Sequence, residues 1–358
     1  MRRTDTLIVG GGPAGSASAI RLAQAGRRPL LIERSREGLD STCGGFLSWT
    51  TLAALERLGI DRDALRAEPV DSMAIFSPTG SARTRLPALA AAVSRRRLDR
   101  LLIERAAQAG AAVERGTGVR RLDPDRALLA DGGEFGFESL VLATGKHDLR
   151  GAARPPAADG PMVGLSWSLG VTAGLRAAVA RTIELHLFRG GYAGLVLQEE
   201  SANLCLAIDR DRLDEAGGRP DALLRALAAE CPVLADRIGA ASAMGGAKAI
   251  ANMPYGWRAR RTAPGLYRVG DQAGVVPSFA GEGIALALTG GAAAADALLR
   301  GMPAETFQPR LARRLRRPLM VAGATVRLAK HPAGARVMVS ATGRLPSLAR
   351  LVAGWMRI

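Results

Sequence analysis

Three glycines near the start of the chain have the spacing of a phosphate-binding loop. Gly10, Gly12 and Gly15 form a GxGxxG pattern directly after the apolar run 5–9 and at the start of an alanine-rich helical stretch. The first glycine permits a tight turn, the second lets the backbone approach a pyrophosphate, and the third lets helix and strand pack closely. The unpaired amides at the start of the helix then face the phosphates.

Glu33 adds an acid at the distance that this pattern requires. It ends the next apolar run, residues 29–33, and follows the last glycine of the pattern by about 20 residues. A carboxylate at this place can accept a hydrogen bond from a ribose hydroxyl. Strand, glycine turn, helix and acid together predict a dinucleotide-binding βαβ unit. They leave open whether the dinucleotide carries a nicotinamide or a flavin.

A second glycine-rich segment lies far along the chain. A strand-like run, 266–270, leads to Asp271, and Gly281 and Gly283 precede a long helix of small residues, 284–298. The start of such a helix can stabilise negative charge on a ligand. The segment 270–284 resembles the second FAD signature of the superfamily of geranylgeranyl reductases and p-hydroxybenzoate hydroxylases.

The resemblance implies FAD as the cofactor, and three further segments support it. Cys43-Gly44-Gly45 is similar to a segment that marks the reductase branch and lies near the flavin. Arg95 and Asp99 resemble a helix whose arginine contacts FAD, and Arg34 follows Glu33 at another usual contact position. The cofactor-binding residues expected on this basis are Gly10, Gly12, Pro13, Ala14, Gly15, Glu33, Arg34, Cys43, Gly44, Gly45, Arg95, Ala143, Thr144, Gly145, Gly270, Asp271, Pro277, Gly281, Glu282, Gly283 and Ile284.

The hydroxylases of this superfamily carry an Asp-Gly motif that positions both FAD and NADPH. Here the matching stretch reads Ala143-Thr144-Gly145, so Thr144 replaces the aspartate. NADPH or NADH stays a possible reductant, but the usual motif for its direct use is missing. The charged residues 146–148 follow at once and could meet a nicotinamide phosphate or lie in a solvated loop.

Residues 184–198 occupy the place of the superfamily's Tyr-x-Trp-x-Phe-Pro strand above the flavin. Tyr192 is kept, whereas Gly194 replaces the tryptophan and Gln198 the proline. The loss of an indole should open space above the flavin ring for a bulkier substrate.

We take Cys43, His186 and Tyr192 as candidate catalytic residues. His186 alternates with two leucines, so it points to the opposite face of its strand from both. Each residue could also have a purely structural role: Cys43 as a small buried thiol, His186 as a histidine packed in a strand, and Tyr192 as a tyrosine packed in the core. Cys205 and Cys231 read as core residues. No spacing typical of a metal site, a nucleophile elbow or a P-loop occurs.

These residues must be positioned by an α/β fold. Strands at 5–9 and 29–33, helices at 48–59 and 96–109, and successive strands in 112–144 predict a Rossmann-like FAD-binding domain with a parallel sheet. A hairpin in 70–88 and two alternating runs in 182–209, joined through Gly190-Gly191, predict a second, mostly antiparallel sheet. The expected FAD-binding domain is 1–70, 95–160 and 255–300; the substrate domain is 71–94 and 161–254; a helical tail is 303–358.

Composition sets outer limits on the function. The 358 residues suit about two domains, and 48% hydrophobic residues exclude general disorder. Three widely spaced cysteines without a CxxC pair exclude a disulfide scaffold and indicate a reducing compartment. No apolar run reaches the length of a membrane span. We therefore expect a cytoplasmic protein.

The net charge of +16 is concentrated at the C-terminal end. Residues 301–358 contain eleven arginines or lysines and a single acid, Glu305. This tail could be a solvated helical face, a peripheral contact with the inner face of a membrane, or a nucleic-acid site. The chain offers no aromatic platform or nucleic-acid module, so we expect no nucleic-acid partner.

The sequence thus predicts a FAD-dependent oxidoreductase that acts on an apolar aromatic, polyketide-like or isoprenoid molecule. The open space above the flavin favours a monooxygenase, in which reduced flavin and oxygen hydroxylate the substrate. The Cys-Gly-Gly segment implies the alternative, a reductase of carbon–carbon double bonds in a prenyl or lipid substrate. A third reading is an electron-relay flavoprotein docked on a membrane or partner.

Overall fold

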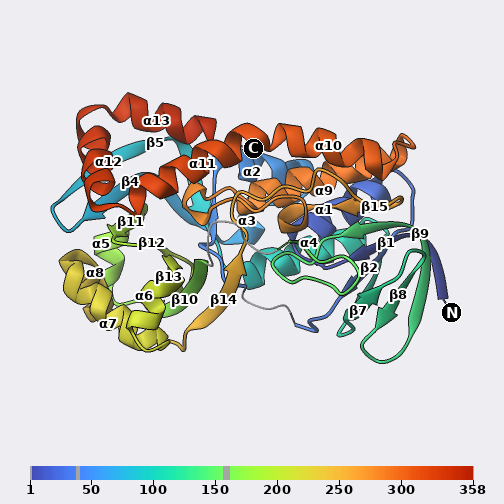
Figure 1. Ribbon diagram of the computed structural model, residues 1–358, viewed down its shortest axis with the longest axis horizontal. Helices are drawn as coiled ribbons and strands as arrows, with labels where there is room; N and C mark the ends of the chain where they lie inside the picture. The colour runs from blue at the N-terminus through green and yellow to red at the C-terminus, as the bar shows by residue number, and fades with distance from the viewer. Residues whose placement is uncertain (1, 38–40, 156–161, 358) are drawn as a thin grey trace.

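The computed structural model describes residues 2–37, 41–155 and 162–357 and contains two sheets side by side (Figure 1). The first sheet has seven strands. Its parallel centre consists of β1 (Arg2–Val9), β2 (Leu30–Glu33), β6 (Ala112–Arg115), β9 (Glu134–Leu142) and β15 (Leu266–Arg268). The strands β7 (Val119–Leu122) and β8 (Arg126–Leu129) continue it in antiparallel fashion. This is the predicted Rossmann-like sheet.

Helices cover one face of the first sheet. They are α1 (Pro13–Gln24), α2 (Trp49–Arg57), α4 (Arg95–Gln108) and α9 (Gly283–Leu299), and their side chains form one core with Ile8, Leu31 and Val141. Small residues let α1 and α9 pack closely. A Cβ at Gly291 would lie 2.1 Å from the Ala14 carbonyl oxygen, and Ser18 Oγ donates to the Gly291 carbonyl at 2.9 Å. This packing brings the two glycine-rich segments together.

The second sheet has eight strands in the order β14-β10-β13-β12-β11-β4-β5-β3. Its pairs are antiparallel except for β11 with β4. The strands are β3 (Phe46–Leu47), β4 (Glu68–Ser77), β5 (Gly80–Ala92), β10 (Met162–Gly170), β11 (Thr182–Phe188), β12 (Gly191–Leu197), β13 (Ser201–Asp209) and β14 (Lys248–Met253). The sheet therefore begins earlier in the chain than position 71, where we placed the start of the substrate domain.

The region 182–209 differs from the prediction, because it holds three strands rather than two runs. Gly190, with φ of +79°, makes the turn between β11 and β12. Every residue of β12 is buried. A strand buried on both faces shows no alternation of polar and apolar residues. The sequence pattern therefore could not separate β12 from its neighbours.

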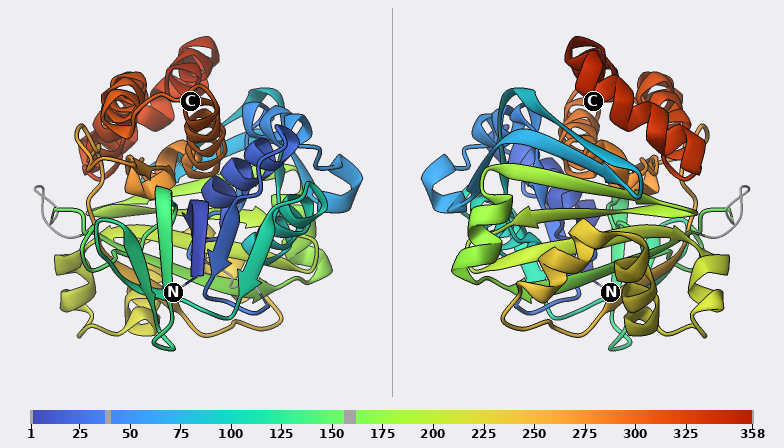
Figure 2. Two further views of the ribbon diagram at one scale, coloured as in Figure 1. Left: turned by 90° about the vertical axis from the view of Figure 1, so that its right-hand side faces the viewer. Right: turned by 90° about the vertical axis from the view of Figure 1, so that its left-hand side faces the viewer.

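Helices pack on both faces of the second sheet (Figure 2). Residues of α5 (Ala173–Val179), α7 (Pro220–Glu230) and α8 (Pro232–Gly239) share a core with one face, and α6 (Arg210–Glu215) follows β13. The other face meets α11 (Arg316–Ala329) and α12 (Pro332–Arg344). The short α3 (Arg62–Leu65) precedes β4, and α10 (Ala304–Arg314) and α13 (Pro346–Trp355) complete the C-terminal helices.

The C-terminal segment is mostly helical between Ala304 and Trp355, as predicted, and it reaches both halves of the molecule: α10 contacts β15 and α9, whereas α12 lies against β4 and β5. None of the helices in the described part of the chain combines the length and apolar character needed to cross a bilayer.

Candidate active site

A cavity of about 1240 Å³ lies where the two sheets meet. Its walls come from both glycine-rich segments, from residues 41–46, from the second sheet and from the C-terminal helices. This volume exceeds that of an ordinary small-molecule pocket, which is roughly 300–1,000 Å³. The cavity therefore has room for a cofactor and a substrate together.

The phosphate loop has the conformation that its glycines predict. Gly10 has φ of +106°, and a Cβ there would lie 2.5 Å from the Ala143 carbonyl oxygen. A Cβ at Gly15 would lie 1.9 Å from the Gly10 carbonyl oxygen, so this glycine serves packing and does not line the cavity. Gly12 caps the N-terminus of α1 and lines the cavity. The backbone is therefore free to approach a pyrophosphate.

Glu33 and Arg95 flank this loop. The Glu33 carboxylate accepts from the amides of Gly11 at 2.7 Å and Ser35 at 2.8 Å, which fixes it at the cavity wall. Arg95 donates two hydrogen bonds to Asp99, at 2.9 and 2.8 Å. Burial opposes the charge on the guanidinium, but the Asp99 carboxylate outweighs it and raises the pKa of Arg95. Arg95 therefore stays cationic beside the loop.

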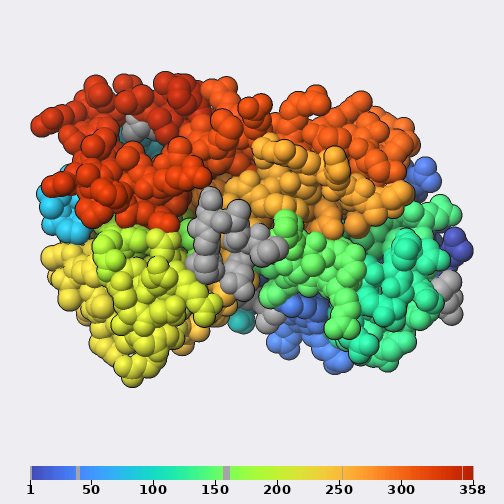
Figure 3. Space-filling view, in the orientation of Figure 1, coloured from blue at the N-terminus to red at the C-terminus, as the bar shows by residue number. Residues whose placement is uncertain are grey.

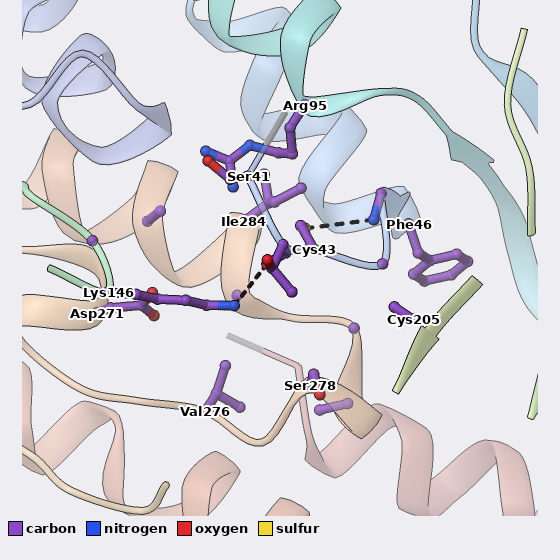
Figure 4. Close-up of a pocket in the computed structure, with 18 of the residues that line it drawn as sticks. Ser41, Cys43, Phe46, Arg95, Lys146, Cys205, Asp271, Val276, Ser278 and Ile284 are labelled. Atoms are coloured by element: carbon purple, nitrogen blue, oxygen red, sulfur yellow. Dashed lines mark hydrogen bonds between the residues drawn. The ribbon is translucent and has the colours of Figure 1, made fainter. Parts of the chain in front are cut away.

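The second glycine-rich segment forms the opposite part of the wall. Asp271 lies in a short 3-10 turn after β15, and Gly281, with φ of +66°, leads into α9. A Cβ at Gly281 would lie 2.9 Å from the Phe46 ring, so the close approach requires glycine. Asp271 and the start of α9 both face the cavity (Figure 4).

Two residues of this segment that we expected to bind the cofactor do not line the cavity. Pro277 lies behind the wall, between Val276 and Ser278. Glu282 is fully buried and forms an ion pair with Arg357, whose guanidinium also lies 4.5 Å from the centre of the Trp49 ring. Glu282 thus ties the C-terminal end of the chain to the start of α9, and we leave it out of the cofactor site.

The Cys43-Gly44-Gly45 segment is held in place from both halves of the molecule. The Cys43 carbonyl accepts from Asn203 Nδ2 at 2.8 Å, and Lys146 Nζ donates to the Thr42 carbonyl at 2.7 Å. The Cys43 thiol accepts from the Gly45 amide at 3.4 Å (Figure 4). This segment therefore presents the thiol to the cavity on a braced loop.

Tyr192 belongs to a buried cluster of hydroxyl groups. Its hydroxyl lies 2.6 Å from Ser278 Oγ, and Tyr255 lines the same cavity beside them. Burial raises the pKa of Tyr192 well above its usual value and also raises that of Tyr255, so both phenols keep their protons. All three residues line the cavity.

His186 does not reach the cavity. It is 1% exposed, stacks on Phe76 at 4.9 Å and lies 3.2 Å from Glu184, which pairs with Arg237 of α8 at 3.0 Å. Its neighbour Leu185 lines the cavity, and the alternation of β11 sends His186 to the other face of the sheet. We therefore leave His186 out of the site.

Lys146, Cys205, Tyr255 and Ser278 line the cavity but were not among the site residues predicted from the sequence. Burial raises the pKa of the Cys205 thiol to about 12, so it stays protonated. Asn203 and Cys205 alternate in β13 with core leucines, and this period-2 pattern is the signal that could have placed Cys205 on the cavity face. Of the neighbouring charged loop, Asp148 is paired with Arg154 at 2.8 Å, whereas Lys146 points into the cavity.

Comparison with known proteins agrees with this geometry. A family model described as a FAD binding domain matches residues 3–129. The chain is 35% identical over 173 residues to digeranylgeranylglycerophospholipid reductase 2 of Methanopyrus kandleri, a match that covers 48% of this chain and 40% of that protein. It is 31% identical over 163 residues to a menaquinone reductase of Mycolicibacterium smegmatis, which covers 42% of this chain and 39% of the relative.

The matched region therefore spans about two fifths of the length of these relatives. Among solved structures, the flavin-dependent brominase Bmp2 superposes with a TM-score of 0.81 at 19% identity, over 99% of this chain and 93% of its own. At that identity the likeness shows the fold alone. The match to a FAD binding domain confirms FAD as the cofactor predicted from the glycine-rich segments.

Proposed function

We propose that this chain, which matches a FAD binding domain over residues 3–129 and is similar to a digeranylgeranylglycerophospholipid reductase and a menaquinone reductase, reduces carbon–carbon double bonds in an apolar, isoprenoid-type substrate. The observation that carries this proposal is the set of apolar side chains that line one end of the cavity. Beyond Tyr192 the cavity continues along β4, β5 and β11 to the C-terminal helices, over the side chains of Met73, Ile75, Leu86, Ile183, Leu185, Met338 and Val352. Such an apolar channel suits a long hydrocarbon chain.

The relatives make reduction a stronger proposal than hydroxylation, which the sequence had placed first. Of the curated relatives with more than 30% identity, two are named as a digeranylgeranylglycerophospholipid reductase and a menaquinone reductase. Both names describe substrates with isoprenoid chains. The Cys-Gly-Gly segment, which resembles that of the reductase branch, lies on the cavity wall.

When bound and reduced by an electron donor, the flavin would supply the hydride for such a reduction. The amides at the start of α1 and the cationic Arg95 would hold the pyrophosphate, and Glu33 the ribose. The substrate carbon that does not receive the hydride needs a proton. The Cys43 thiol and the Tyr192 phenol both line the cavity, and the phenol is hydrogen-bonded to Ser278, through which its proton can be replaced.

An anaerobic single-turnover experiment tests this function. The FAD-loaded protein, reduced with dithionite, is mixed with a polyprenyl quinone or a geranylgeranyl glycerolipid, and the flavin absorbance and product mass are followed. We expect reoxidation of the flavin together with a product whose isoprenoid chain has gained two hydrogens, a mass gain that persists after any quinol head group is reoxidised to the quinone. Failure of every isoprenoid substrate to reoxidise the flavin would overturn the proposal.

A monooxygenase is the second candidate, and the space at Gly194 favours it. Gly194 lines the cavity where the hydroxylase strand would carry a tryptophan, so no indole covers this part of it, and a Cβ at this glycine would be in ordinary contact with Cys205 Sγ at 3.4 Å. Hydroxylation requires oxygen, and the same reaction in ¹⁸O₂ would then place one labelled atom in the product. An unlabelled, saturated product supports the reductase instead.

The electron donor is tested separately, by anaerobic titration of the oxidised protein with NADPH or NADH. Rapid bleaching would identify a reduced nicotinamide as the donor, although Thr144 replaces the aspartate of the hydroxylase motif. Bleaching by dithionite alone would point to a protein donor and to the relay reading. We further propose a cytoplasmic site of action, which suits the free thiols of Cys43, Cys205 and Cys231.

A further inference from the structure

Large apolar side chains reach solvent mainly on the C-terminal helices. Among the described residues, those that are exposed in α11, α12, α13 and the turn before α13 are Met320, Leu328, Val337, Leu345, Leu348, Leu351 and Trp355. Only Leu89 and Met244 are comparably exposed elsewhere in the described ranges. A concentration of this kind marks an interaction surface, whereas single exposed apolar residues are normal. We call these seven residues the apolar patch.

The apolar patch lies in a strongly basic surface. The chain from 306 to 358 contains no aspartate or glutamate. Arg317, Arg336, Arg344 and Arg350 are exposed on the same three helices, and Arg317 lies 5.3 Å from the centre of the exposed Trp355 ring. Apolar side chains among arginines, with an indole beside them, are typical of helices that lie in the interface of an anionic bilayer.

The cavity opens at the apolar patch. Leu328, Val337 and Leu348 belong to the patch and also line the cavity, so they form its rim. Arg85 of β5 and Arg350 of α13 lie at the same rim and are exposed. In the space-filling view the face formed by these helices is hollowed at its centre (Figure 3). The opening is thus apolar and flanked by cations.

We infer that α11, α12 and α13 dock on an anionic phospholipid bilayer, and that the cavity takes its substrate from this surface. The charge complementarity and the rim both favour a bilayer over a second copy of the chain, because a second copy would bring the same cations against each other. An isoprenoid chain could then pass from the bilayer to Tyr192 without crossing water. This last step rests on the proposed function, whereas the docking itself does not.

Vesicle binding tests the docking without turnover. The FAD-loaded full chain is floated with vesicles of phosphatidylcholine alone and of phosphatidylcholine with phosphatidylglycerol, at low and high salt. We expect binding to the anionic vesicles that weakens with salt. The double variant Leu345→Ser/Leu351→Ser should lower the partition coefficient by about tenfold or more, since both side chains lie outside the cavity and would insert in the bilayer.

Matched variants separate the patch from general surface properties. Met244→Ser removes an apolar side chain of similar exposure from another part of the surface, and Arg225→Gln removes an exposed charge from α7; neither should change vesicle binding. Arg336→Gln/Arg344→Gln should lower binding several-fold and reduce its salt dependence. Bound flavin absorbance reports folding of each variant.

Equal vesicle binding by the leucine variant and the wild type, or no binding by the wild type, would overturn the inference. A dimer in light scattering that the leucine variant converts to a monomer would identify a second copy as the occupant and would overturn it as well. Neither result depends on whether the reduction assay succeeds, so docking and the proposed function can fail independently.

Discussion

Cys43 and Tyr192 reach the same cavity from different surroundings. The Cys43 thiol accepts from the Gly45 amide on a loop whose Cys43 carbonyl is paired with Asn203, whereas the Tyr192 hydroxyl is hydrogen-bonded to Ser278. Renewal of a transferred proton is therefore easier at Tyr192. The thiol is better placed to meet the substrate near the flavin, as its segment's resemblance to the reductase branch implies.

Replacement of these two residues separates their roles. We expect Cys43→Ala and Tyr192→Phe to keep FAD, because neither supplies the phosphate or ribose contacts. Replacement of the residue that donates the proton should lower the single-turnover rate of double-bond reduction by about 10²–10⁴-fold. The rate of flavin reoxidation, followed by absorbance under anaerobic conditions, measures this effect.

Cys205→Ala is the matched control, since this thiol lines the cavity but its pKa is raised to about 12 by burial. It should leave the single-turnover rate within a few-fold of wild type. Unchanged rates in both Cys43→Ala and Tyr192→Phe would remove these residues from the proposed proton transfer. Ser278→Ala should leave the single-turnover rate unchanged and lower the multiple-turnover rate. This substitution keeps the Tyr192 phenol but removes its hydrogen-bond partner.

At the scale of the elements, the packing of α1 against α9 determines whether the FAD site forms. The two helices meet at Gly291, where an added Cβ would lie 2.1 Å from the Ala14 carbonyl oxygen. Because backbone cannot move aside as a flexible side chain can, we expect Gly291→Ala to separate the helices. The loss should be about 1–3 kcal/mol of unfolding free energy, as for other overpacked sites, with weaker FAD binding. Urea titration and flavin fluorescence measure the two effects.

Gly290 provides a control in the same helix. An added Cβ there would meet nothing closer than the Gly270 amide at 3.7 Å, which is ordinary contact. Since alanine is a better helix former than glycine by about 1 kcal/mol, Gly290→Ala should leave stability unchanged or raise it. If both variants lose stability equally, helix spacing at Gly291 is not the cause.

The start of α9 is also connected to the C-terminal end of the chain. Glu282 is fully buried and its carboxylate pairs with Arg357. Removal of one partner leaves a buried charge, which costs about 3–5 kcal/mol in other proteins. We therefore expect Arg357→Gln to destabilise the protein strongly and to weaken FAD binding through α9. Thermal unfolding with and without added FAD would measure this.

The double variant Glu282→Gln/Arg357→Gln checks the cause of that effect. It removes both charges, so it should recover most of the stability that Arg357→Gln loses. Absence of any recovery would mean that the stacking of Arg357 on Trp49 matters more than the ion pair. The sequence predicted Glu282 as a cofactor-binding residue because it lies between two signature glycines. Its partner Arg357 is far away in the sequence, so the ion pair could not be foreseen.

Elements with one buried face were predictable, and elements without one were not. Strand β1 shows a polar start and an apolar end, and α4 follows its cap at Ser94, so both could be placed from their own residues. Strand β12 is buried throughout, so its sequence shows no alternation of polar and apolar residues. His186 was correctly set opposite to Leu185, but the sequence could not tell which face of β11 the cavity would occupy, since this depends on pairing with β4 and β12.

For the whole molecule, the FAD half was predictable because local geometry determines it. Three features can each be recognised within a short segment. They are glycines at positions where a Cβ would clash with neighbouring atoms, an acid directly after a strand, and a helix of small residues. The far end of the cavity could not be read in this way. It forms where α12 and α13 meet β5, and most of the lining residues there are exposed or half-buried and belong to no sequence motif. The hydroxyl cluster likewise joins residues from three separate segments.

Several thiols and phenols are buried in their protonated form, so the free energy of unfolding should decrease at alkaline pH. Burial raises the pKa of Cys205 to about 12 and that of Cys231 to about 11, and it also raises the pKa values of Tyr192 and Tyr255. In the unfolded chain a cysteine loses its proton near pH 8.5 and a tyrosine near pH 10. Above about pH 8.5 the unfolded state therefore binds fewer protons than the native state, and stability falls as pH rises.

We expect the unfolding free energy to be constant from about pH 7 to 8 and to fall by roughly 2–4 kcal/mol by about pH 10. Urea titrations at each pH, with FAD held at one saturating concentration so that cofactor binding contributes equally, measure this decrease. Cys205→Ala removes one of the buried thiols and should flatten the slope, because the unfolded chain then has one group fewer to ionise. A stability that stays level or rises between pH 8 and 10 would show that these thiols and phenols are open to solvent, and with them the inner part of the cavity that Cys205, Tyr192 and Tyr255 line.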